Sequence, residues 1–386
     1  MTQALTGIRV ADFSHVMAGP FASHLLRLMG AEVIKIESPS GDNFRSYGSD
    51  RRYDGMSPAF IAVNAGKKSI VLDLKDPDDL ATARAIVAQS DVLIENFRPG
   101  VMARLGLGYD AAKALAQGII YCSVSGYGQD GPMRDWPAID NIVQATSGMM
   151  SLSGGPSDPP SRVGFPLVDT LTGQTAALAI LGALIKRGRT GVGERLDIAM
   201  FDASLAFMTS AVVPFLVTGQ TMKRTGNTGY SGLPTSGAFT AGDGRLMALG
   251  VVQPNQFAAL ARHLGREDWL DDPRYATPDA QRANADALQV ELTQAFSSKG
   301  AAEWEAELSA AGIPCGMVRN VGEAASLPHL GERGAILPVT VPGLPDGEEV
   351  AIMSAGFSTG GSDLPPPPRL NEHRDEILNL LKESIS

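Results

Sequence analysis

The sequence has little cysteine and no long hydrophobic run, and both absences narrow the class of protein. Its 386 residues include two cysteines, Cys122 and Cys315, which are too few for a disulfide framework or a thiolate metal cage. The longest apolar runs, 176–185 and 205–217, are shorter than the roughly 18 residues of a membrane span. Residues 1–7 have no signal-peptide pattern. We therefore expect a cytoplasmic protein with no metal site and no membrane partner, in which both apolar runs are buried helices.

Positive charge is also scarce, since 32 basic residues stand against 42 acidic ones and the formal net charge is −10. A field of this sign repels nucleic acid and anionic membranes, so we expect neither as a partner. A small anionic ligand would need a local cluster of cations. The length and the 44% of hydrophobic residues are typical of a compact protein with about two domains.

Strand and helix patterns alternate along the first half of the chain. Residues 8–13 predict a strand, and a loop separates it from a helical pattern that ends at Gly30. The Asp76-Pro77 pair predicts a helix start, because Asp is a good N-cap and Pro fits the first helical position. Further strands are expected over 33–37, 69–74, 91–95, 119–125 and 194–198, and further helices over 77–89 and from Asp169 to Lys186. This alternation predicts an α/β fold with a doubly wound, Rossmann-like sheet.

The composition changes over residues 218–237, which are rich in Gly, Thr and Pro and have no apolar period. We interpret this stretch as a crossing into a second, smaller α+β section. Its predicted elements are a strand over 246–251 and helices over 256–264, 284–296 and 302–311. The tail from Gly331 is rich in turns and ends in a short amphipathic helix over 371–382.

Several familiar site patterns are incomplete. Glu37 ends the second predicted strand, as the ribose-binding acid of a dinucleotide site does, but the preceding loop holds only Gly19 where that motif needs three glycines. The segment 229–233 resembles a nucleophile elbow without its last glycine. The five histidines are dispersed, with no short-spaced pair to bind a metal. These patterns favour neither a nucleotide-dependent, a serine-hydrolase nor a metal-dependent enzyme.

Asp169 is a better candidate for a reactive group. An apolar extended segment from Val163 leads to it, and it stands at the predicted start of a long helix. It is either a helix N-cap or a functional carboxylate, which the N–H groups of the helix end would keep ionised. An ionised carboxylate in an apolar pocket can attack an activated acyl group.

Short motifs follow one another along nearly the whole chain. They are GIRV at 7–10 with AGP at 18–20, GAEVIKIE at 30–37, Asn64 with KKSI at 67–70, NFRPG at 96–100, SGYG at 125–128, the segment 164–173, GVGE at 191–194 and EH at 372–373. In this order they resemble the motifs of class III CoA-transferases. That family contains formyl-CoA transferase and, as a divergent branch, α-methylacyl-CoA racemase.

The resemblance implies that Asp169 is the nucleophile. It would attack a donor thioester to give a mixed anhydride and would then carry CoA as an aspartyl-CoA thioester. CoA and acyl-CoA are substrates in this scheme, and no tightly bound cofactor is expected. The implied CoA contacts are Val16, Met17, Ala18, Leu72, Lys75, Asn96, Phe97, Arg98, Arg104 and Tyr127. Of these, Lys75, Arg98 and Arg104 would meet the phosphates.

The chain departs from known branches of the family at a few positions. Ser38 and Pro137 replace an arginine and a lysine of formyl-CoA transferases, and Arg134 is a candidate substitute. Ile139 stands where the racemase branch has a proton-transferring histidine. This difference favours transfer of CoA, for example from succinyl-CoA, to a small carboxylic acid. An acyl-CoA racemase or isomerase and a non-catalytic acyl-CoA binder are the alternatives.

The family also implies an architecture. We expect a large domain that begins with residues 1–220 and is completed by the returning C-terminal part, 326–386. The small domain would span 221–325. Two such chains would form an interlocked homodimer.

Overall fold

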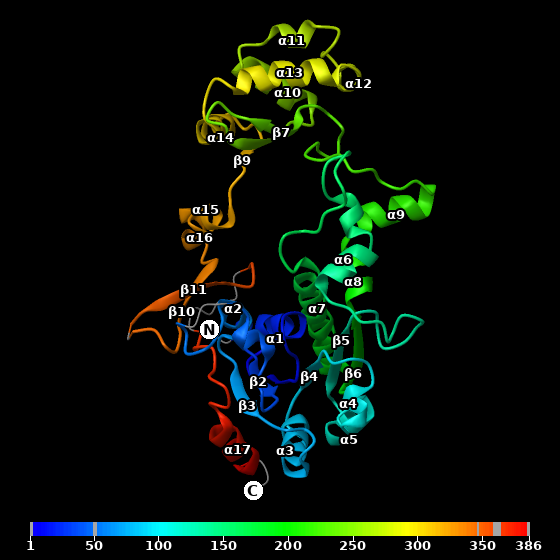
Figure 1. Cartoon of the computed structure of the whole chain (residues 1–386), viewed down its shortest axis with the longest axis vertical. Helices are drawn as coiled ribbons and strands as arrows, with labels where there is room; N and C mark the ends of the chain where they lie inside the picture. Colours follow the sequence, from blue (N-terminus) through cyan, green and yellow to red (C-terminus); the bar gives the residue numbers. More distant parts are fainter. Residues whose placement is uncertain (1–2, 49–51, 346, 358–363, 384–386) are drawn as a thin grey trace. The chain divides into compact units, whose positions relative to one another are not determined.

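The structure is a computed structural model that describes residues 3–48, 52–345, 347–357 and 364–383. The chain folds into two compact units, and Figure 1 labels most of their elements. The first unit comprises residues 1–150, 162–221 and 328–386, and the second comprises 151–161 and 222–327. The short segment 151–161, which is rich in Ser, Gly and Pro, thus groups with the second unit.

A six-stranded parallel sheet organises the first unit. Its strands are β1 (Arg9–Asp12), β2 (Glu32–Glu37), β3 (Lys68–Val71), β4 (Val92–Glu95), β5 (Ile120–Ser125) and β6 (Glu194–Ala199). The order is β3-β2-β1-β4-β5-β6, so Ala11 of β1 pairs with Ile34 on one side and with Leu93 on the other. The predicted α/β fold with a parallel sheet is confirmed, and all six carboxyl ends lie at one edge.

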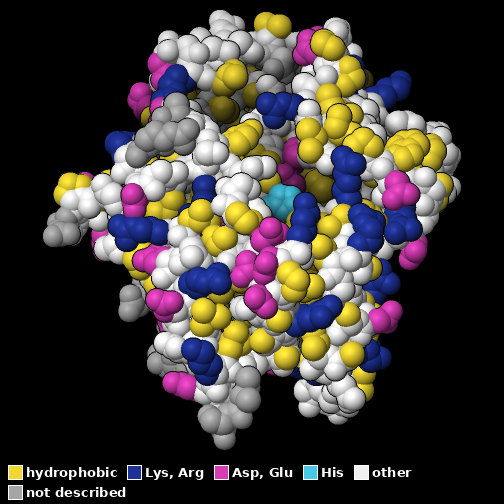
Figure 2. Space-filling model, turned by 60° about the horizontal axis from the view of Figure 1, so that its bottom comes forward, with side chains coloured by type: hydrophobic (Ala, Val, Ile, Leu, Met, Phe, Trp, Pro, Cys, Tyr) yellow, Lys and Arg dark blue, Asp and Glu magenta, His cyan; other side chains and the backbone are white. Residues whose placement is uncertain are grey.

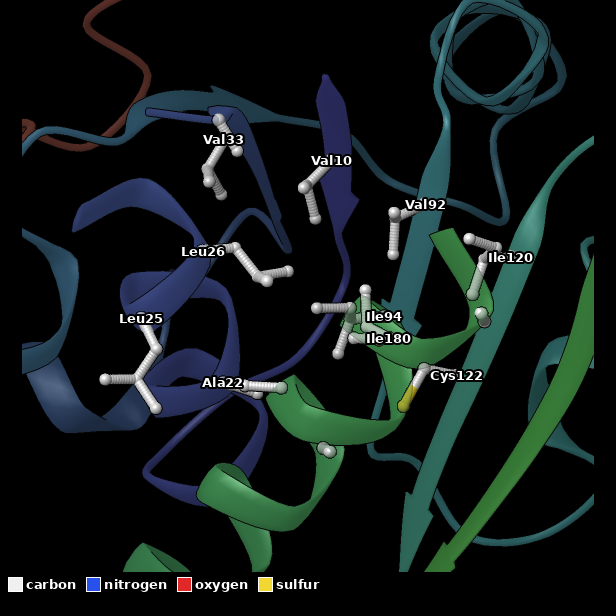
Figure 3. Close-up of a cluster of buried hydrophobic side chains, with 14 of the residues drawn as sticks. Val10, Ala22, Leu25, Leu26, Val33, Val92, Ile94, Ile120, Cys122 and Ile180 are labelled. Atoms are coloured by element: carbon white, nitrogen blue, oxygen red, sulfur yellow. The ribbon is translucent and has the colours of Figure 1, made fainter. Parts of the chain in front are cut away.

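Helices cover both faces of this sheet. α1 (Ala18–Leu28) and α7 (Leu167–Thr190) pack on one face, where Figure 3 shows Leu26 and Ile180 beside strand residues such as Ile94. α3 (Pro77–Ala88), α5 (Tyr109–Leu115) and α17 (Arg374–Glu383) pack on the other face, around Leu93 and Tyr121. Both faces of the strands are therefore apolar, as in a doubly wound sheet.

The other elements of the first unit are mostly short. They are η1 (Asn43–Ser46), α2 (Pro58–Asn64), α4 (Val101–Arg104), α6 (Asp140–Thr146), α8 (Met200–Phe207), α9 (Thr209–Thr218), α16 (Pro328–Glu332) and the antiparallel pair β10 (Ile336–Thr340) and β11 (Glu349–Met353). η2 (Met149–Leu152) lies where the chain passes from the first unit to the second.

The second unit combines an antiparallel sheet with helices. The sheet order is β7 (Ser236–Thr240), β8 (Leu246–Gly250), β9 (Cys315–Met317). The helices are α10 (Pro254–His263), α11 (Asp268–Asp271), α12 (Pro278–Ala283), α13 (Ala285–Phe296), α14 (Ala301–Ala310) and α15 (Val321–Ala325). Phe239, Trp269 and Leu292 are among its core residues. The strand and the three helices predicted for this section are all present.

Local signals explain where two important helices begin and end. The Asp76 side chain accepts hydrogen bonds from the N–H groups of Asp78 and Asp79, both at 3.0 Å, so the predicted cap of α3 is confirmed. α7 is longer than predicted and ends where Gly191 adopts a left-handed conformation, with φ of 71°. Among the described residues, α7 is long and apolar enough to span a membrane, and α8 with α9 passes the same test only as one bent pair. α7 nevertheless packs against α1 and the sheet, as a core helix does.

The prediction that the 205–217 run forms a buried helix was wrong. α8 and α9 meet at an angle of 80°, and α9 has no buried residue. Leu216 and Val217 are 72% and 78% exposed. An apolar run indicates that its side chains are unfavourable in water. It does not indicate whether the same chain or another molecule covers them.

Candidate active site

The carboxyl edge of the parallel sheet carries most of the residues implied as CoA contacts. Ligands of such sheets bind at this edge, where the strand order reverses, which is here between β1 and β4. Val16, Met17 and Ala18 follow β1, Leu72 and Lys75 follow β3, Asn96, Phe97 and Arg98 follow β4, and Tyr127 follows β5.

The turn between β1 and α1 has an unusual backbone. Val16 has a φ of 66°, which is unfavourable for a β-branched residue. Its N–H donates to both carboxylate oxygens of Asp42, at 3.1 and 3.2 Å. The Asn96 side chain accepts from the His15 N–H at 2.9 Å and donates to the His15 carbonyl at 2.8 Å. The turn is therefore held from the loops after β2 and after β4.

The structure joins some predicted contacts to this turn and separates others. The Phe97 ring lies 5.4 Å from the His15 ring, between centroids. Leu72 is 1% exposed in the core, so only its backbone can face a ligand. Tyr127 is buried against Trp136 and Phe201. Phe97 thus lies at the turn, whereas the side chains of Leu72 and Tyr127 are buried.

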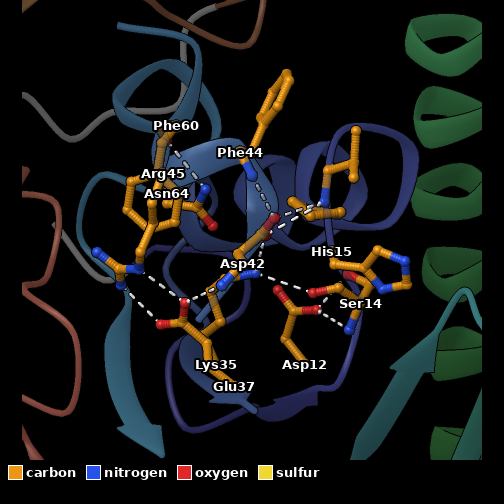
Figure 4. Close-up of polar contacts among 12 residues, drawn as sticks. Asp12, Ser14, His15, Lys35, Glu37, Asp42, Phe44, Arg45, Phe60 and Asn64 are labelled. Atoms are coloured by element: carbon orange, nitrogen blue, oxygen red, sulfur yellow. Dashed lines mark hydrogen bonds and ion pairs between the residues drawn. The ribbon is translucent and has the colours of Figure 1, made fainter. Parts of the chain in front are cut away.

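A buried cluster of charges supports the turn, as Figure 4 shows. Lys35 pairs with Asp42 at 2.8 Å and donates to the Ser14 carbonyl at 2.9 Å. Lys67 pairs with Asp12 at 3.0 Å. Burial alone would raise the pKa of Asp12, but the charges of Lys67 and Lys35 lower it to about 2. Asp12 is therefore ionised at neutral pH, and the cluster is a fixed support for the turn.

Glu37, which mimics a ribose-binding acid in the sequence, belongs to the same support. Its carboxylate accepts two hydrogen bonds from Arg45, at 2.7 and 2.8 Å, and one from Ser69 at 2.7 Å. Both oxygens are occupied, so this carboxylate is not free to bind a ribose. The sequence patterns did not reveal the cluster because its members come from separate strands and loops.

Asp169 lies in the first turn of α7, with Pro166 as the N-cap residue. Burial and, to a smaller extent, the nearby Asp140 carboxylate together raise the pKa of its carboxyl group to about 7. Hydrogen bonds do not contribute to this shift. A carboxyl group with such a pKa changes its ionisation state near neutral pH, which suits a reactive group.

The expectation that the helix end keeps Asp169 ionised is corrected by the structure. The N–H groups of Val168 and Asp169 donate to one carboxylate oxygen of Asp140, at 2.7 and 3.1 Å. Asp140 is thus the anion that uses the positive end of α7. The sequence could not indicate this role, because Asp140 lies 29 residues before Asp169.

α1 and α7 pack closely where α1 begins. Gly173 lies one helical turn after Asp169, on the same face of α7. A Cβ atom placed on Gly173 would lie 2.7 Å from the Ala18 carbonyl oxygen. A side chain larger than that of glycine would therefore force α1 and α7 apart at this crossing.

Two arginines meet at Gly100, in the loop after β4. Guanidinium nitrogens of Arg104 and Arg134 lie 3.3 and 3.5 Å from the position of a Cβ on Gly100. Arg98 is in the same loop, and all three arginines are exposed.

Lys75 follows β3, at the far end of the sheet order, so it is not brought into this group of arginines. Figure 2 shows Lys and Arg side chains gathered on part of the surface despite the net negative charge.

In the part of the chain that the structure describes, no three His, Cys, Asp or Glu side chains come together as they would around a metal ion. The site instead combines a desolvated carboxyl group, a rigid turn and exposed arginines. Such an arrangement can attack an acyl group and hold an anionic ligand.

Comparison with known proteins gives consistent matches over the whole chain. The model of a family described as CoA-transferase family III matches residues 5–374. The acetyl-CoA:oxalate CoA-transferase of Acetobacter aceti is 41% identical, over 95% of this chain and 92% of that protein. The succinyl-CoA:glutarate CoA-transferase of Mus musculus is 34% identical, over 97% of this chain and 85% of that protein. A crystal structure of a CAIB/BAIF family protein from Brucella suis has a TM-score of 0.87 and 31% identity, over 99% of this chain and 100% of that chain.

Proposed function

The chain belongs to CoA-transferase family III, and on this premise we propose that it moves CoA from an acyl-CoA donor to a small carboxylic acid through covalent intermediates on Asp169. As an acyl-CoA:carboxylate CoA-transferase it is an enzyme, which removes the non-catalytic binder as an alternative. The observation that carries the proposal is the Asp169 carboxyl group, which is desolvated and has a pKa raised to about 7.

The proposed reaction needs one carboxylate and no water. An Asp169 oxygen bonds to the donor carbonyl carbon, the C–S bond breaks, and CoA leaves as a thiolate with that electron pair. The thiolate sulfur then bonds to the Asp169 carbonyl carbon, and the donor acid departs as a carboxylate when the anhydride C–O bond breaks. The acceptor carboxylate repeats these steps in reverse, which releases acceptor-CoA and restores the Asp169 carboxylate.

We propose that the CoA portion lies along the carboxyl edge of the sheet. The 16–18 turn would contact the thioester end, and the close packing of Gly173 against Ala18, one helical turn from Asp169, supports this placement. Arg98, Arg104 and Arg134 would bind phosphate groups, since exposed guanidinium groups match phosphate oxygens in geometry and charge. Arg134 would thereby supply the positive charge of the lysine that Pro137 replaces.

The acceptor is proposed to be a small dicarboxylate or hydroxy acid, with succinyl-CoA or acetyl-CoA as the donor. This choice follows the names of the relatives, which include acetyl-CoA:oxalate, succinyl-CoA:glutarate and succinyl-CoA:D-citramalate CoA-transferases. The test mixes the purified protein with each donor and with oxalate, glutarate, citramalate, mesaconate or formate, and detects new acyl-CoA by mass spectrometry.

Asp169→Ala should lower every exchange rate by more than about a thousandfold, as loss of a nucleophile does in other covalent enzymes. Asp202→Ala is the matched control, because Asp202 is an exposed acid in the first turn of the neighbouring helix α8. Hydroxylamine should convert Asp169 to its hydroxamate only when donor is present, which peptide mass spectrometry detects. Full exchange by Asp169→Ala would exclude Asp169 as the carrier.

Racemization is the weaker alternative for this site. It needs two proton-transferring groups on opposite faces of the α-carbon, and Ile139 occupies the position of the racemase histidine. The Ile139 side chain is 63% exposed and has no group to titrate. Deuterium incorporation at the α-carbon of a branched acyl-CoA, without an acceptor acid, would nevertheless favour a racemase.

We also propose that the enzyme acts in the cytoplasm as an interlocked homodimer. Cys122 and Cys315 are free thiols, as expected in a reducing compartment. The apolar surface of α9 supports a partner copy. Cell fractionation tests the compartment, and recovery of the protein with membranes or the medium would contradict it.

A further inference from the structure

The Asp140 side chain, at the start of α6, contacts the N-terminal end of α7. One of its carboxylate oxygens accepts both the Val168 and the Asp169 N–H, at 2.7 and 3.1 Å. The helix that carries the proposed nucleophile is therefore capped by an acid from another helix, and the last residue so held is Asp169 itself.

Gln144 extends this connection along the segment that leads to α7. Its side-chain N–H donates to the other oxygen of Asp140 at 2.6 Å, and its carbonyl oxygen accepts from the Val163 N–H at 2.9 Å. Gln144 is completely buried, so its orientation is fixed by packing as well. α6 thus holds the 163–169 segment at both ends.

We propose that Asp140 is a positioning residue that fixes the Asp169 backbone and favours acylation of its carboxylate. This inference rests on the proposed function, in which Asp169 is the nucleophile. The geometry supports it directly, because the donors that would otherwise stabilise an Asp169 carboxylate are already occupied by Asp140.

The electrostatic setting of Asp169 agrees with this assignment. Burial and the Asp140 charge both raise its pKa, to about 7. Other charged or titratable groups lie on the elements that pack against α7, or at its far end. They are His24 and Arg27 on α1, Asp202 on α8, Tyr121 and Cys122 on β5, Glu194, Arg195 and Asp197 on β6, and Lys186, Arg187 and Arg189 on α7 itself. None of these contributes to the shift, which leaves Asp140 as its one charged cause.

The charge of Asp140 favours acylation of Asp169, because acylation removes the negative charge of Asp169. Two neighbouring carboxylates repel one another in the free enzyme. When Asp169 forms the anhydride or the thioester, its negative charge is lost and that repulsion disappears. Asp140 thereby favours the covalent intermediates over the free enzyme, and it also makes the Asp169 oxygen a stronger nucleophile.

The test is the pH profile of kcat/KM for CoA exchange. Exchange by the native enzyme should rise with pH through about 7, as Asp169 ionises. Asp140→Asn keeps an acceptor oxygen for the α7 N–H groups but removes the charge. Its profile should shift about one pH unit toward acid, and its rate on the alkaline side should fall about tenfold.

Two variants separate charge from structure in this experiment. Gln144→Met removes the hydrogen bond to Asp140 and leaves the charge, so it should lower the rate without moving the profile. Asp202→Asn removes an exposed carboxylate from α8 and should change neither. A profile for Asp140→Asn that coincides with the native one would overturn the proposal.

A second readout does not depend on activity. Carbon-13 NMR of aspartate-labelled protein follows the Asp169 carboxyl group directly, with its signal identified by its loss in Asp169→Asn. The midpoint of this titration should move toward acid in Asp140→Asn, and an unmoved midpoint would contradict the inference. If the native protein exchanges no CoA, the proposed function fails, while this titration still decides whether Asp140 sets the ionisation of Asp169.

Discussion

Burial raises the pKa of both Asp12 and Asp169, but their partners make the outcomes opposite. Asp12 is fully buried, but two lysines and two serine hydroxyls stabilise its charge, and its pKa is about 2. Asp169 lacks such partners, and its pKa is about 7. A buried carboxyl group without partners destabilises the fold whenever it is ionised. Asp12 therefore supports the structure, whereas Asp169 is suited to a reaction.

The arginine pair at Gly100 gives a prediction for CoA binding. Arg104→Ala and Arg134→Ala should each raise KM for the acyl-CoA donor about tenfold or more, because a lost charged hydrogen bond costs about 1.5–3 kcal/mol. The double variant should lose less than the product of the two effects if both groups bind one phosphate. Steady-state kinetics measure this, and KM of the native enzyme should rise with salt.

Arg189→Ala provides the control, because Arg189 is an exposed cation in the last turn of α7, far along the helix from Asp169. Its KM should match that of the native enzyme. Equal KM values for Arg134→Ala and Arg189→Ala would show that Arg134 does not replace the missing lysine.

At the scale of elements, the crossing of α1 and α7 determines the geometry of the site. Gly173→Ala would place a methyl group 2.7 Å from the Ala18 carbonyl oxygen and 3.0 Å from the Phe21 ring. Overpacking of this kind costs about 1–3 kcal/mol, which exceeds the gain of about 1 kcal/mol from replacing glycine in a helix. We expect lower stability in denaturant unfolding and a lower kcat, because α1 and its turn must move.

The same helix supplies a matched substitution. Gly182 is exposed, and a Cβ atom on it would meet nothing within 4 Å. Gly182→Ala should therefore stabilise the protein by up to about 1 kcal/mol and leave CoA exchange unchanged. If Gly173→Ala proved as stable and as active as Gly182→Ala, the crossing would not be tightly packed in solution.

The elements that the sequence predicted well are those with local signals. Asp76 and Pro77 mark the start of α3 because cap and proline act within one turn. The start of α7 was predicted two residues late, because its cap comes from Asp140 on another helix. The charged support below the 16–18 turn joins Lys35 and Lys67 to acids on other elements, so no spacing rule could have identified it.

Contacts between distant segments are even harder to predict for the whole molecule, because the N-terminal and C-terminal parts of the chain belong to one unit. The Asn371 N–H donates to the Ser69 hydroxyl at 3.1 Å, across 302 residues of sequence. Composition indicated a crossing near 218–237, and the observed boundary falls at 221 and 222. The C-terminal return could be expected only from the family resemblance, since no local pattern in the tail indicates its partner.

Several large apolar side chains on α8 and α9 are exposed to solvent. Phe207 of α8 and Val213, Phe215, Leu216 and Val217 of α9 are 47–78% exposed in the single chain. Large apolar patches on a soluble protein usually mark an interaction surface. Since the proposed homodimer needs an interface, we assign this surface to contact with a second copy of the chain.

This assignment predicts that Leu216→Glu combined with Val217→Glu weakens self-association. The native protein should elute at twice the mass of one chain, and light scattering should give the same mass on dilution, because interlocked chains cannot separate without unfolding. The double variant should yield monomer or misassembled protein, because charges would be buried against apolar groups. Val321→Glu is the control, since Val321 is 86% exposed on α15 of the second unit. A native monomer would overturn the homodimer, whereas an intact dimer of the double variant would place its interface away from α9.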